Sequence, residues 1–203
     1  MAAEGKSIKS FVLMVRYPGA VAFLSPEGAK KFHKLEDLKG AIAGVTAPGS
    51  SSHFFVNYLL AKHGLAAEDV SVVGLGANAS RVAAIDRSKV DIGILFEPGV
   101  TQLVHRSPSA VMLADTRTQG GVQQVFGTMT YPSVVLYATG SWLGQNPETA
   151  RRLARAIQRT LRWMQEHSPE QIAEKIPADS VEMTQLFMWK LSATPWRCFH
   201  RTV

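Results

Sequence analysis

Three consecutive serines and a histidine follow a Pro-Gly turn in the first third of the chain. They are Ser50, Ser51, Ser52 and His53. The turn ends a short apolar stretch at 41–46, and apolar residues then recur at helical spacing as far as His63. The serines therefore lie at a helix start, where unpaired backbone N–H groups, the helix dipole and short hydroxyls can hold a carboxylate, sulfonate or phosphate. A serine cap that binds no ligand uses the same residue type, so both interpretations stay open.

Two further loops follow apolar stretches in the same way. Residues 74–78 contain Gly74 and Gly76 and end in Ala77 and Asn78, and Asn78 is predicted to cap the next helix. A loop with two glycines lets the backbone approach a ligand closely. The third loop places Glu97 after an apolar stretch. Its carboxylate either caps or forms a hinge, or it accepts hydrogen bonds from a ligand amine or ring nitrogen.

The sequence contains no recognisable catalytic or metal-binding pattern. Its single cysteine, Cys198, excludes an intrachain disulfide and a cysteine-based zinc site, and its six histidines have no His-x-x-x-His spacing. The loop at 74–78 lacks the third glycine of a dinucleotide-binding fingerprint. No Gly-x-Ser-x-Gly motif occurs. We therefore expect no enzyme activity, no cofactor and no bound metal.

The elements that must position these loops alternate between strand and helix. Strands are predicted at 41–46, 70–74, 91–96 and 110–114, and helices at 50–63, 78–87 and 98–105. This alternation predicts an α/β fold with a mostly parallel, doubly wound sheet. Ligands of such sheets bind beyond the carboxyl ends of the strands, where all three loops are expected.

The flanking regions have a different pattern. Residues 10–15 and 20–24 predict two short strands, which form either a hairpin or one interrupted strand. The other predicted elements are a short helix at 26–33, a charged connection at 35–40, strands at 122–126 and 133–139, a long helix at 147–167 with Asn146 as its cap, and a helix from Ser168 that ends before Pro177. Residues 178–203 begin helically and then lose any period.

Composition limits the class of protein. The chain has 203 residues, of which 46% are hydrophobic and 19% charged, so it can form one larger domain or two small lobes. The net charge is +6, but the only dense basic group, five arginines within 151–162, has the spacing of a solvated helix face. Residues 1–10 lack the apolar core of a signal peptide, and no run reaches the ~20 apolar residues of a membrane span.

Many spaced positions, taken in order, resemble one protein family. They are Leu38-Lys39-Gly40, Gly44-Val45, Pro48 to Phe54, Gly64-Leu65, Glu68-Asp69-Val70, Gly74-Leu75-Gly76, Ala83-Ala84-Ile85, Val90-Asp91-Ile92-Gly93 and Glu97-Pro98. This pattern resembles the substrate-binding proteins of nitrate/sulfonate/taurine-type ABC importers. The same superfamily includes pyrimidine-precursor-binding proteins related to thiamine biosynthesis. The resemblance is specific over 35–99 and looser over 131–177.

The resemblance implies a type II periplasmic-binding-protein-like fold, whose two lobes close on a ligand like a hinged clamp. It implies that residues 8–35 and 128–190 form a partial first lobe and residues 36–127 the second lobe. The N-terminal part of the first lobe and a signal peptide are expected to be missing, and residues 194–203 depart from the family.

The resemblance also implies which residues contact the ligand. In the second lobe these are Ser50, Ser51, Ser52, His53, Gly76, Ala77, Asn78 and Glu97. Arg16 and Tyr17 match the region of the first crossing between lobes, and Tyr131 the return crossing. Arg16 either pairs with an anionic ligand through its two-pronged guanidinium or is only an exposed turn residue.

The function implied is that of a non-enzymatic solute-binding component of an ABC importer. It would capture a small polar or anionic compound, namely a sulfonate, a nitrate-like anion or a heteroaromatic compound, in an interlobe cleft. The expected partners are this small-molecule ligand and an ABC permease in the inner membrane, with no nucleic acid, and the chain is expected to be a monomer. The expected location is periplasmic, or cytoplasmic if the chain is full-length.

Three alternatives remain open at this point. The first is a pyrimidine-precursor synthase-like enzyme of the same fold, although such enzymes carry a cysteine-rich motif and this chain has one cysteine. The second is a ligand-sensing effector domain of a transcriptional regulator, which would need an N-terminal helix-turn-helix that does not precede Ser10. The third is an inactive fragment that binds nothing.

Overall fold

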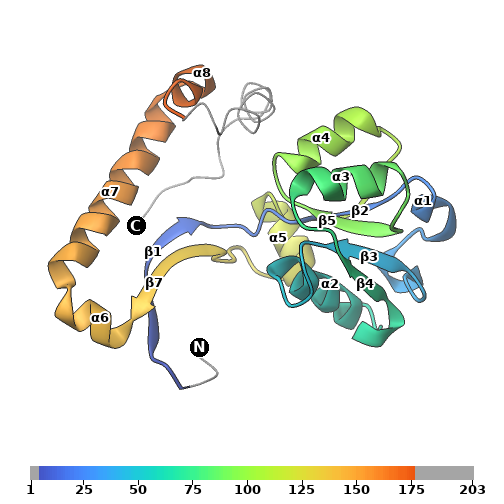
Figure 1. The fold of residues 1–203 in the computed structure, drawn as a ribbon, viewed down its shortest axis with the longest axis horizontal. Coiled ribbons are helices and arrows are strands. Elements are labelled where there is room, and N and C mark those ends of the chain that lie inside the picture. Colours follow the sequence, from blue (N-terminus) through green and yellow to red (C-terminus); the bar gives the residue numbers. More distant parts are fainter. Residues whose placement is uncertain (1–4, 177–203) are drawn as a thin grey trace. The chain divides into compact units, whose positions relative to one another are not determined.

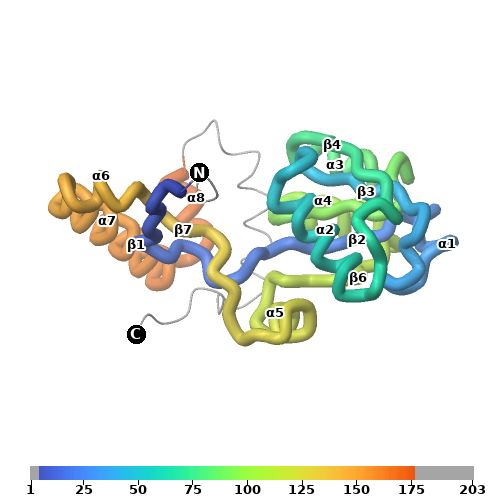
Figure 2. The backbone as a smooth tube through the Cα atoms, turned by 90° about the horizontal axis from the view of Figure 1, so that it is seen from below, coloured from blue at the N-terminus to red at the C-terminus, as the bar shows by residue number. Residues whose placement is uncertain are grey.

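The computed structural model describes residues 5–176, which divide into two compact units (Figure 1). The larger one, the 19–128 unit, is continuous in sequence, and the terminal unit combines the residues before and after it. Figure 2 follows the chain from the terminal unit into the 19–128 unit and back again. Within the described residues, no helix has the length and apolar character needed to cross a membrane.

The 19–128 unit is built on a five-stranded sheet in the order β4-β3-β5-β2-β6. The strands are β2 (Val21–Leu24), β3 (Ile42–Val45), β4 (Ser71–Gly74), β5 (Ile92–Leu95) and β6 (Val111–Asp115). β3 runs parallel to β4 and β5, whereas β2 is antiparallel to β5 and β6. Four of the five strands thus share one direction, which confirms the mostly parallel sheet.

Helices cover both faces of this sheet. They are α1 (Gly28–Lys31), α2 (Ser51–Lys62), α3 (Asn78–Asp86), α4 (Gly99–Arg106) and α5 (Gln119–Phe126), with short 3-10 turns η2 (Leu35–Asp37) and η3 (Ala67–Asp69). Figure 1 shows α3 and α4 on one face and α2 on the other. The alternation of strands and helices between residues 41 and 114 is therefore confirmed.

Each face of the sheet buries its own cluster of apolar side chains, and β2 contributes to both. Ala22 and Leu24 belong to the cluster on the α2 face, whereas Val21 and Phe23 belong to the cluster under α3 and α4. All four side chains are fully buried. This is the pattern of a strand covered on both faces by helices.

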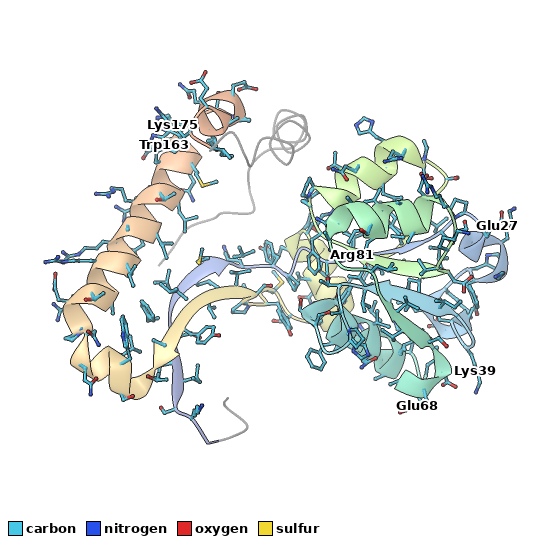
Figure 3. All side chains as sticks on the ribbon, in the orientation of Figure 1. Glu27, Lys39, Glu68, Arg81, Trp163 and Lys175 are labelled. Atoms are coloured by element: carbon cyan, nitrogen blue, oxygen red, sulfur yellow. The ribbon has the colours of Figure 1, made fainter. Side chains whose placement is uncertain are left out.

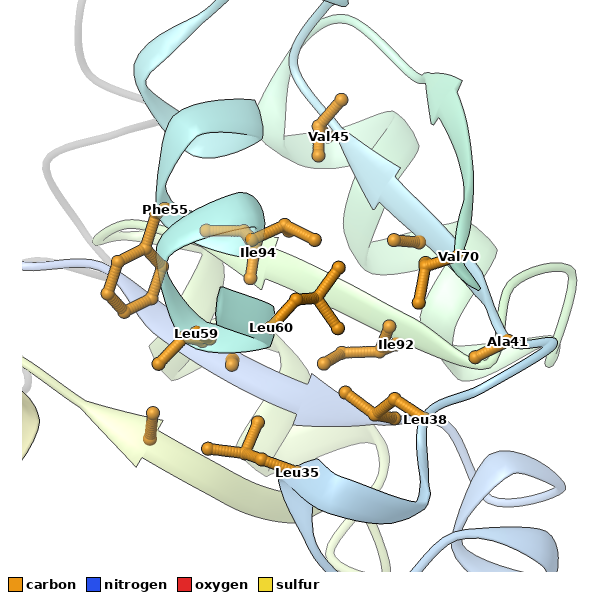
Figure 4. Packing of buried hydrophobic residues seen from close by; sticks show 14 of the residues in the cluster. Leu35, Leu38, Ala41, Val45, Phe55, Leu59, Leu60, Val70, Ile92 and Ile94 are labelled. Carbon is orange, nitrogen blue, oxygen red and sulfur yellow. The ribbon is translucent and has the colours of Figure 1, made fainter. Parts of the chain in front are cut away.

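The core on the α2 face fixes the position of that helix. Leu59 and Leu60 from α2 belong to the same cluster as Ile92 and Ile94 from β5 (Figure 4). Burial of one such side chain stabilises the fold by about 1.5–3 kcal/mol. The N-terminus of α2 is thereby held at the end of the sheet where β3 finishes.

Two glycines let α3 and its flanking residues approach the other face closely. A Cβ atom added to Gly93 of β5 would lie 2.4 Å from Cδ1 of Ile85 in α3. A Cβ atom on Gly44 of β3 would lie 2.6 Å from Cδ1 of Leu75. Any larger residue at either position would therefore have to displace the side chain of Ile85 or of Leu75.

In its described residues, 5–18 and 129–176, the terminal unit contains a two-stranded antiparallel ribbon and three helices. β1 (Ile8–Val15) pairs with β7 (Val134–Thr139), and α6 (Gly140–Gln145), α7 (Pro147–Glu166) and α8 (Pro169–Ala173) follow. The mostly parallel arrangement thus applies to the five-stranded sheet only. The arginines of α7 are exposed, as expected of a solvated helix face: Arg151, Arg152, Arg155, Arg159 and Arg162.

Residues 10–15 and 20–24 form neither the predicted hairpin nor the alternative of one interrupted strand. β1 pairs with β7 in the terminal unit, whereas β2 lies between β5 and β6 in the other sheet. β2 is buried on both faces, so it can only be satisfied inside a helix-covered sheet. Residues 19–35 consequently belong to the 19–128 unit and not, as expected, to a partial first lobe with residues 8–18.

The predicted strand at 122–126 is also wrong, because these residues form the second half of α5. The side chain of Thr118 accepts a hydrogen bond from the amide of Gly121, and Gly127 ends the helix with φ +72°. Val122 and Val125, three residues apart, are buried on one helix face. Helix α6 was not predicted, and residues 178–203 lie outside the described part of the chain.

Candidate functional site

The three loops singled out in the sequence do follow β3, β4 and β5, at one edge of the 19–128 unit. The first two loops are in direct contact. The amide of Gly76 donates to the carbonyl of Thr46 at 2.9 Å, and that of Leu75 to the carbonyl of Val45 at 2.8 Å. A Cβ atom on Gly74 would lie 3.1 Å from Cδ of Pro48. The serine loop and the glycine loop thus form one surface at the strand ends.

The first loop leads into α2 and contains backbone N–H groups that have no acceptor among the described residues. Ser50 is the N-cap, and its Oγ accepts from the amide of His53 at 3.4 Å. Gly49 before it has φ +80°, a left-handed conformation that favours glycine. The amides of Ser51 and Ser52 have no acceptor among the described residues. These two N–H groups at the positive end of α2 are available to an anion.

The three serines of this loop have different roles. Ser52 is fully buried, and its Oγ accepts from the amide of Thr46 at 2.9 Å and donates to Oγ1 of the same residue at 3.2 Å. It ties α2 to β3 and has no side chain exposed to a ligand. Ser50 Oγ lies 2.9 Å from Ser52 Oγ, so it is occupied as well. Ser51 is exposed and keeps its hydroxyl for a ligand.

His53 is held by its own loop. Its Nδ1 accepts from the amide of Gly49 at 2.8 Å, which places the ring hydrogen on Nε2 in the neutral form. The ring stacks beside Phe54, with centroids 6.3 Å apart. Its first role is therefore to close the Pro-Gly turn.

The second loop opens α3, and here one prediction is wrong. Ala77 is the N-cap, and Asn78 is the first helical residue. Asn78 does not cap the helix because its side-chain oxygen is already used, since it accepts from Nη2 of Arg81 at 2.5 Å. Gly76 is exposed with φ +72°. The amides of residues 78–80 have no acceptor among the described residues, so α3 also presents unpaired donors.

Arg81 is a site residue that the sequence analysis missed. It comes from α3 (Figure 3) and is only 4% exposed. Its Nη1 donates to the carbonyl of Ile94 at 2.7 Å, and its guanidinium carbon lies 5.8 Å from the centre of the Phe96 ring. Its buried Nε has no partner, and no described carboxylate pairs with it. The spacing of three residues from Asn78 was the only available signal.

The electrostatics of this residue are unusual. Burial disfavours the charged form and lowers the pKa of Arg81 below its ordinary value. A buried cation is normally compensated by a carboxylate, because its desolvation otherwise costs several kcal/mol. Here the carbonyl of Ile94 and the amide oxygen of Asn78 are its partners. The local charge is therefore positive next to the start of α3.

Glu97, in the third loop, is fully engaged within the protein. Its Oε2 accepts from the amide of Thr101 at 3.2 Å and from its Oγ1 at 2.8 Å, and its Oε1 accepts from Nη1 of Arg117 at 2.9 Å. Arg117 also donates to both carboxylate oxygens of Asp115. Burial opposes the charge of Arg117, but its bonds to Asp115 and Glu97 raise its pKa above the ordinary value. These bonds favour the cap interpretation of Glu97.

The start of α4 closes this edge beside Asn78. A Cβ atom on Gly99 would lie 3.1 Å from Cγ of Asn78, so a larger residue there would crowd this side chain. Asn78 is thus held by its hydrogen bond to Arg81 and lies beside Gly99.

The remaining predicted residues belong to the terminal unit. The amide of Tyr131 donates to the carbonyl of Arg16 at 3.1 Å, which joins the two predicted crossings at the backbone. The guanidinium carbon of Arg16 lies 5.8 Å from the ring centre of Tyr17. Tyr17 is buried, whereas Tyr131 is exposed.

A groove of about 390 Å³ lies elsewhere in the 19–128 unit, and no predicted site residue lines it. It runs between β6, η2 and the last turn of α2. Its polar groups are paired with one another. Lys62 donates to the carbonyls of Gln124 and Val125, and Nδ1 of His63 lies 2.7 Å from Glu36.

Two helix N-termini with unpaired amides, an exposed hydroxyl and a buried guanidinium make the strand-end edge suited to an anion. In the part of the chain described, no three His, Cys, Asp or Glu side chains gather as a metal site. The fold is that of the type II periplasmic binding proteins. The chain belongs to the NMT1/THI5-like family, whose model matches residues 1–172.

Solved structures agree with this family. A protein from Bordetella bronchiseptica RB50 is 33% identical with a TM-score of 0.82, over 94% of this chain and 60% of that one. The alkanesulfonate-binding protein SsuA from Xanthomonas axonopodis pv. citri, bound to MOPS, is 18% identical with a TM-score of 0.59, over 95% and 62%. The nitrate-binding protein NrtA from Synechocystis PCC 6803 is 16% identical with a TM-score of 0.59, over 96% and 46%.

These likenesses have defined limits. At 16–18% identity, the SsuA and NrtA structures share the fold alone. The chain spans about 60% of the length of the first two proteins and less than half of NrtA. The search of curated protein sequences gave no significant match.

Proposed function

We propose that the chain is a solute-binding component of an ABC importer and captures a small anion at the strand-end edge of the 19–128 unit. The observation that carries this proposal is the pair of adjacent helix starts, α2 and α3, whose first amides have no acceptor. Helix N-termini bind anions through such amides and through the helix dipole. Among the expected ligand classes, a sulfonate or a nitrate-like anion fits better than a neutral heteroaromatic compound, because Arg81 adds a positive charge.

Membership of the family supports the rest of the proposal. The related structures carry the printed names of sulfonate-binding and nitrate-binding proteins. By analogy, the 19–128 unit would act as one lobe, and the terminal unit would contribute to the other. Ligand capture would favour the closed form that a permease in the inner membrane recognises, which implies a periplasmic location.

The chemistry of the serine loop supports binding rather than catalysis. A nucleophilic serine needs a histidine nitrogen that accepts its proton. Nδ1 of His53 is occupied by the amide of Gly49, and its Nε2 lies 3.4 Å from the side-chain amide of Asn57. Ser50 and Ser52 bond to each other. None of these contacts activates a hydroxyl, so the serine loop gives no support to a serine nucleophile.

A thermal-shift screen tests this function. The 203-residue chain is heated with methanesulfonate, taurine, nitrate, bicarbonate or a pyrimidine. A ligand present at 100 times its Kd stabilises the folded state by about 2.7 kcal/mol. We expect at least one sulfonate or nitrate to raise the melting temperature, and chloride at equal ionic strength to leave it unchanged. No shift with any compound would contradict the proposal.

A further inference from the structure

The side-chain amide of Asn78 can direct either its oxygen acceptor or its N–H donors towards a ligand. Its hydrogen bond with Arg81 determines which of these faces the ligand. A side-chain amide has one oxygen acceptor and one nitrogen with two N–H donors, whereas a guanidinium has donors only. The atom of Asn78 that faces Nη2 of Arg81 must therefore be its oxygen, as the 2.5 Å bond requires. The NH₂ group of Asn78 points to the other side of the amide.

The rest of the local geometry holds this orientation. Arg81 is itself fixed by the carbonyl of Ile94 and by burial under α3. The side chain of Asn78 occupies the space that a Cβ atom on Gly99 would enter, 3.1 Å from its Cγ. The NH₂ group of Asn78 has no acceptor among the described residues. The amide therefore cannot flip without leaving the buried guanidinium short of another partner, which is unfavourable for a charged group.

We propose that Arg81 is a positioning residue that turns Asn78 into a donor, so that the site selects acceptor-only groups, the oxyanions, over isosteric groups that carry their own N–H. This inference rests on the proposed function. The unpaired backbone amides of Ser51, Ser52 and Ala79 supply further donors at the same edge. If a ligand directs its own N–H group at these donors, neither the ligand N–H nor the protein N–H has an acceptor. The site therefore rejects such a ligand.

The uncompensated charge of Arg81 acts in the same direction. With no ion-paired carboxylate among the described residues, the guanidinium of Arg81 attracts an anion and withdraws electrons from the amide oxygen of Asn78. Burial disfavours the charged form of Arg81 and lowers its pKa below the ordinary value. An oxyanion bound at Asn78 would supply the negative charge that the fold itself does not.

The test compares ethanesulfonate with ethanesulfonamide, which have nearly the same shape but differ in charge and in N–H donors. Dissociation constants for both are measured by NMR titration of the 203-residue chain. We expect the sulfonate to bind at least about tenfold more tightly than the sulfonamide. The loss of one buried hydrogen bond to a charged group costs about 1.5–3 kcal/mol. The readout is the ratio of the two dissociation constants. If Arg81 had a merely structural role, its substitution would not change this ratio.

Two variants locate the effect. In Asn78→Asp, a carboxylate pairs with Arg81 and presents only acceptors, so sulfonate binding should fall at least about tenfold and the preference over the sulfonamide should disappear. In Arg81→Met, the side-chain amide of Asn78 is free to flip, so the preference for the sulfonate over the sulfonamide should become smaller. Arg87→Met, at the exposed end of α3, is the matched control and should leave both constants unchanged.

The outcomes separate the inference from the proposed function. If the unmodified chain binds both compounds equally, or if Asn78→Asp keeps the preference, the inference is wrong although solute binding stands. If the chain binds neither compound nor any other in the thermal-shift screen, the proposed function fails and the inference fails with it. Should Arg81→Met not fold, Asn78→Asp still decides, because it adds an ion pair to Arg81 and keeps the side-chain volume.

Discussion

Single residues at the strand-end edge divide into those that hold the fold and those left for a ligand. Ser52 and Glu97 have their oxygens occupied by neighbouring protein groups. Ser51 and Asn78, in contrast, keep donors that have no acceptor among the described residues. Substitutions of the first pair should therefore change stability, and substitutions of the second pair should change binding.

The amide of Ser51 can be removed without removing the helix. Ser51 is the first residue of α2, a position that accepts proline, and Ser50 before it already has the extended conformation that a following proline requires. We expect Ser51→Pro to weaken sulfonate binding about tenfold while the helix content in far-UV circular dichroism is unchanged. Ser51→Ala, which keeps the amide, should weaken binding less. Equal binding by Ser51→Pro and the parent chain would show that this amide does not contact the ligand.

Glu97 should matter for folding. Glu97→Ala removes the acceptor for Thr101 and one partner of Arg117, so we expect the free energy of unfolding in urea to fall by about 1–3 kcal/mol. The matched control is Glu27→Ala, which breaks an exposed pair with Lys30 and should cost less than about 1 kcal/mol. If both variants lose the same stability, the bonds of Glu97 are not those of a structural cap.

At the scale of elements, the seating of α3 on the sheet controls the site, because α3 carries both Asn78 and Arg81. Gly93 is the position where the helix approaches the sheet most directly. The same approach brings Arg81 within reach of the carbonyl of Ile94 on β5. We therefore expect ligand binding and the packing of α3 to be coupled.

Gly93→Ala should move α3. Its new Cβ atom would lie 2.4 Å from Cδ1 of Ile85, so we expect a loss of about 1–3 kcal/mol in urea unfolding together with weaker sulfonate binding. Gly120→Ala, in α5, meets nothing within 4 Å and should instead stabilise the chain by about 0.5–1 kcal/mol. A Gly93→Ala chain with unchanged stability and binding would contradict this coupling.

The elements between residues 41 and 114 could be predicted because each apolar stretch ends in a turn residue and each helix has a local period. The partner of β2 could not, because strand pairing joins residues far apart, here Val21 with Leu95 and with Asp115. Residues 122–126 were mistaken for a strand because a short apolar run carries too few turns to reveal a helical period.

The placement of the three loops after β3, β4 and β5 was predicted, but the contacts of their side chains were not. The loops at 50–53, 76–78 and 97 could be located because strand ends of a parallel sheet meet at one edge. Which serine is buried, and that Glu97 is occupied by Arg117, depend on contacts with distant residues. Arg81 was missed because its burial comes from β5 and the following Phe96, which no local pattern records.

At the scale of the whole molecule, the 19–128 unit contains its own sheet, two buried clusters and the three loops of the candidate site. Of the predicted site residues, Arg16 and Tyr131 belong to the terminal unit instead. The chain belongs to the NMT1/THI5-like family and spans about 60% of its first solved relatives.

The most direct test of anion capture at the strand-end edge is an amide-resolved NMR titration of the 203-residue chain with methanesulfonate. The account predicts saturable shifts that are largest at the backbone amides of Ser51, Ser52, Ala79 and Ser80, with smaller changes along β6. Saturable shifts elsewhere, or no shifts at those four amides at millimolar ligand, would contradict it.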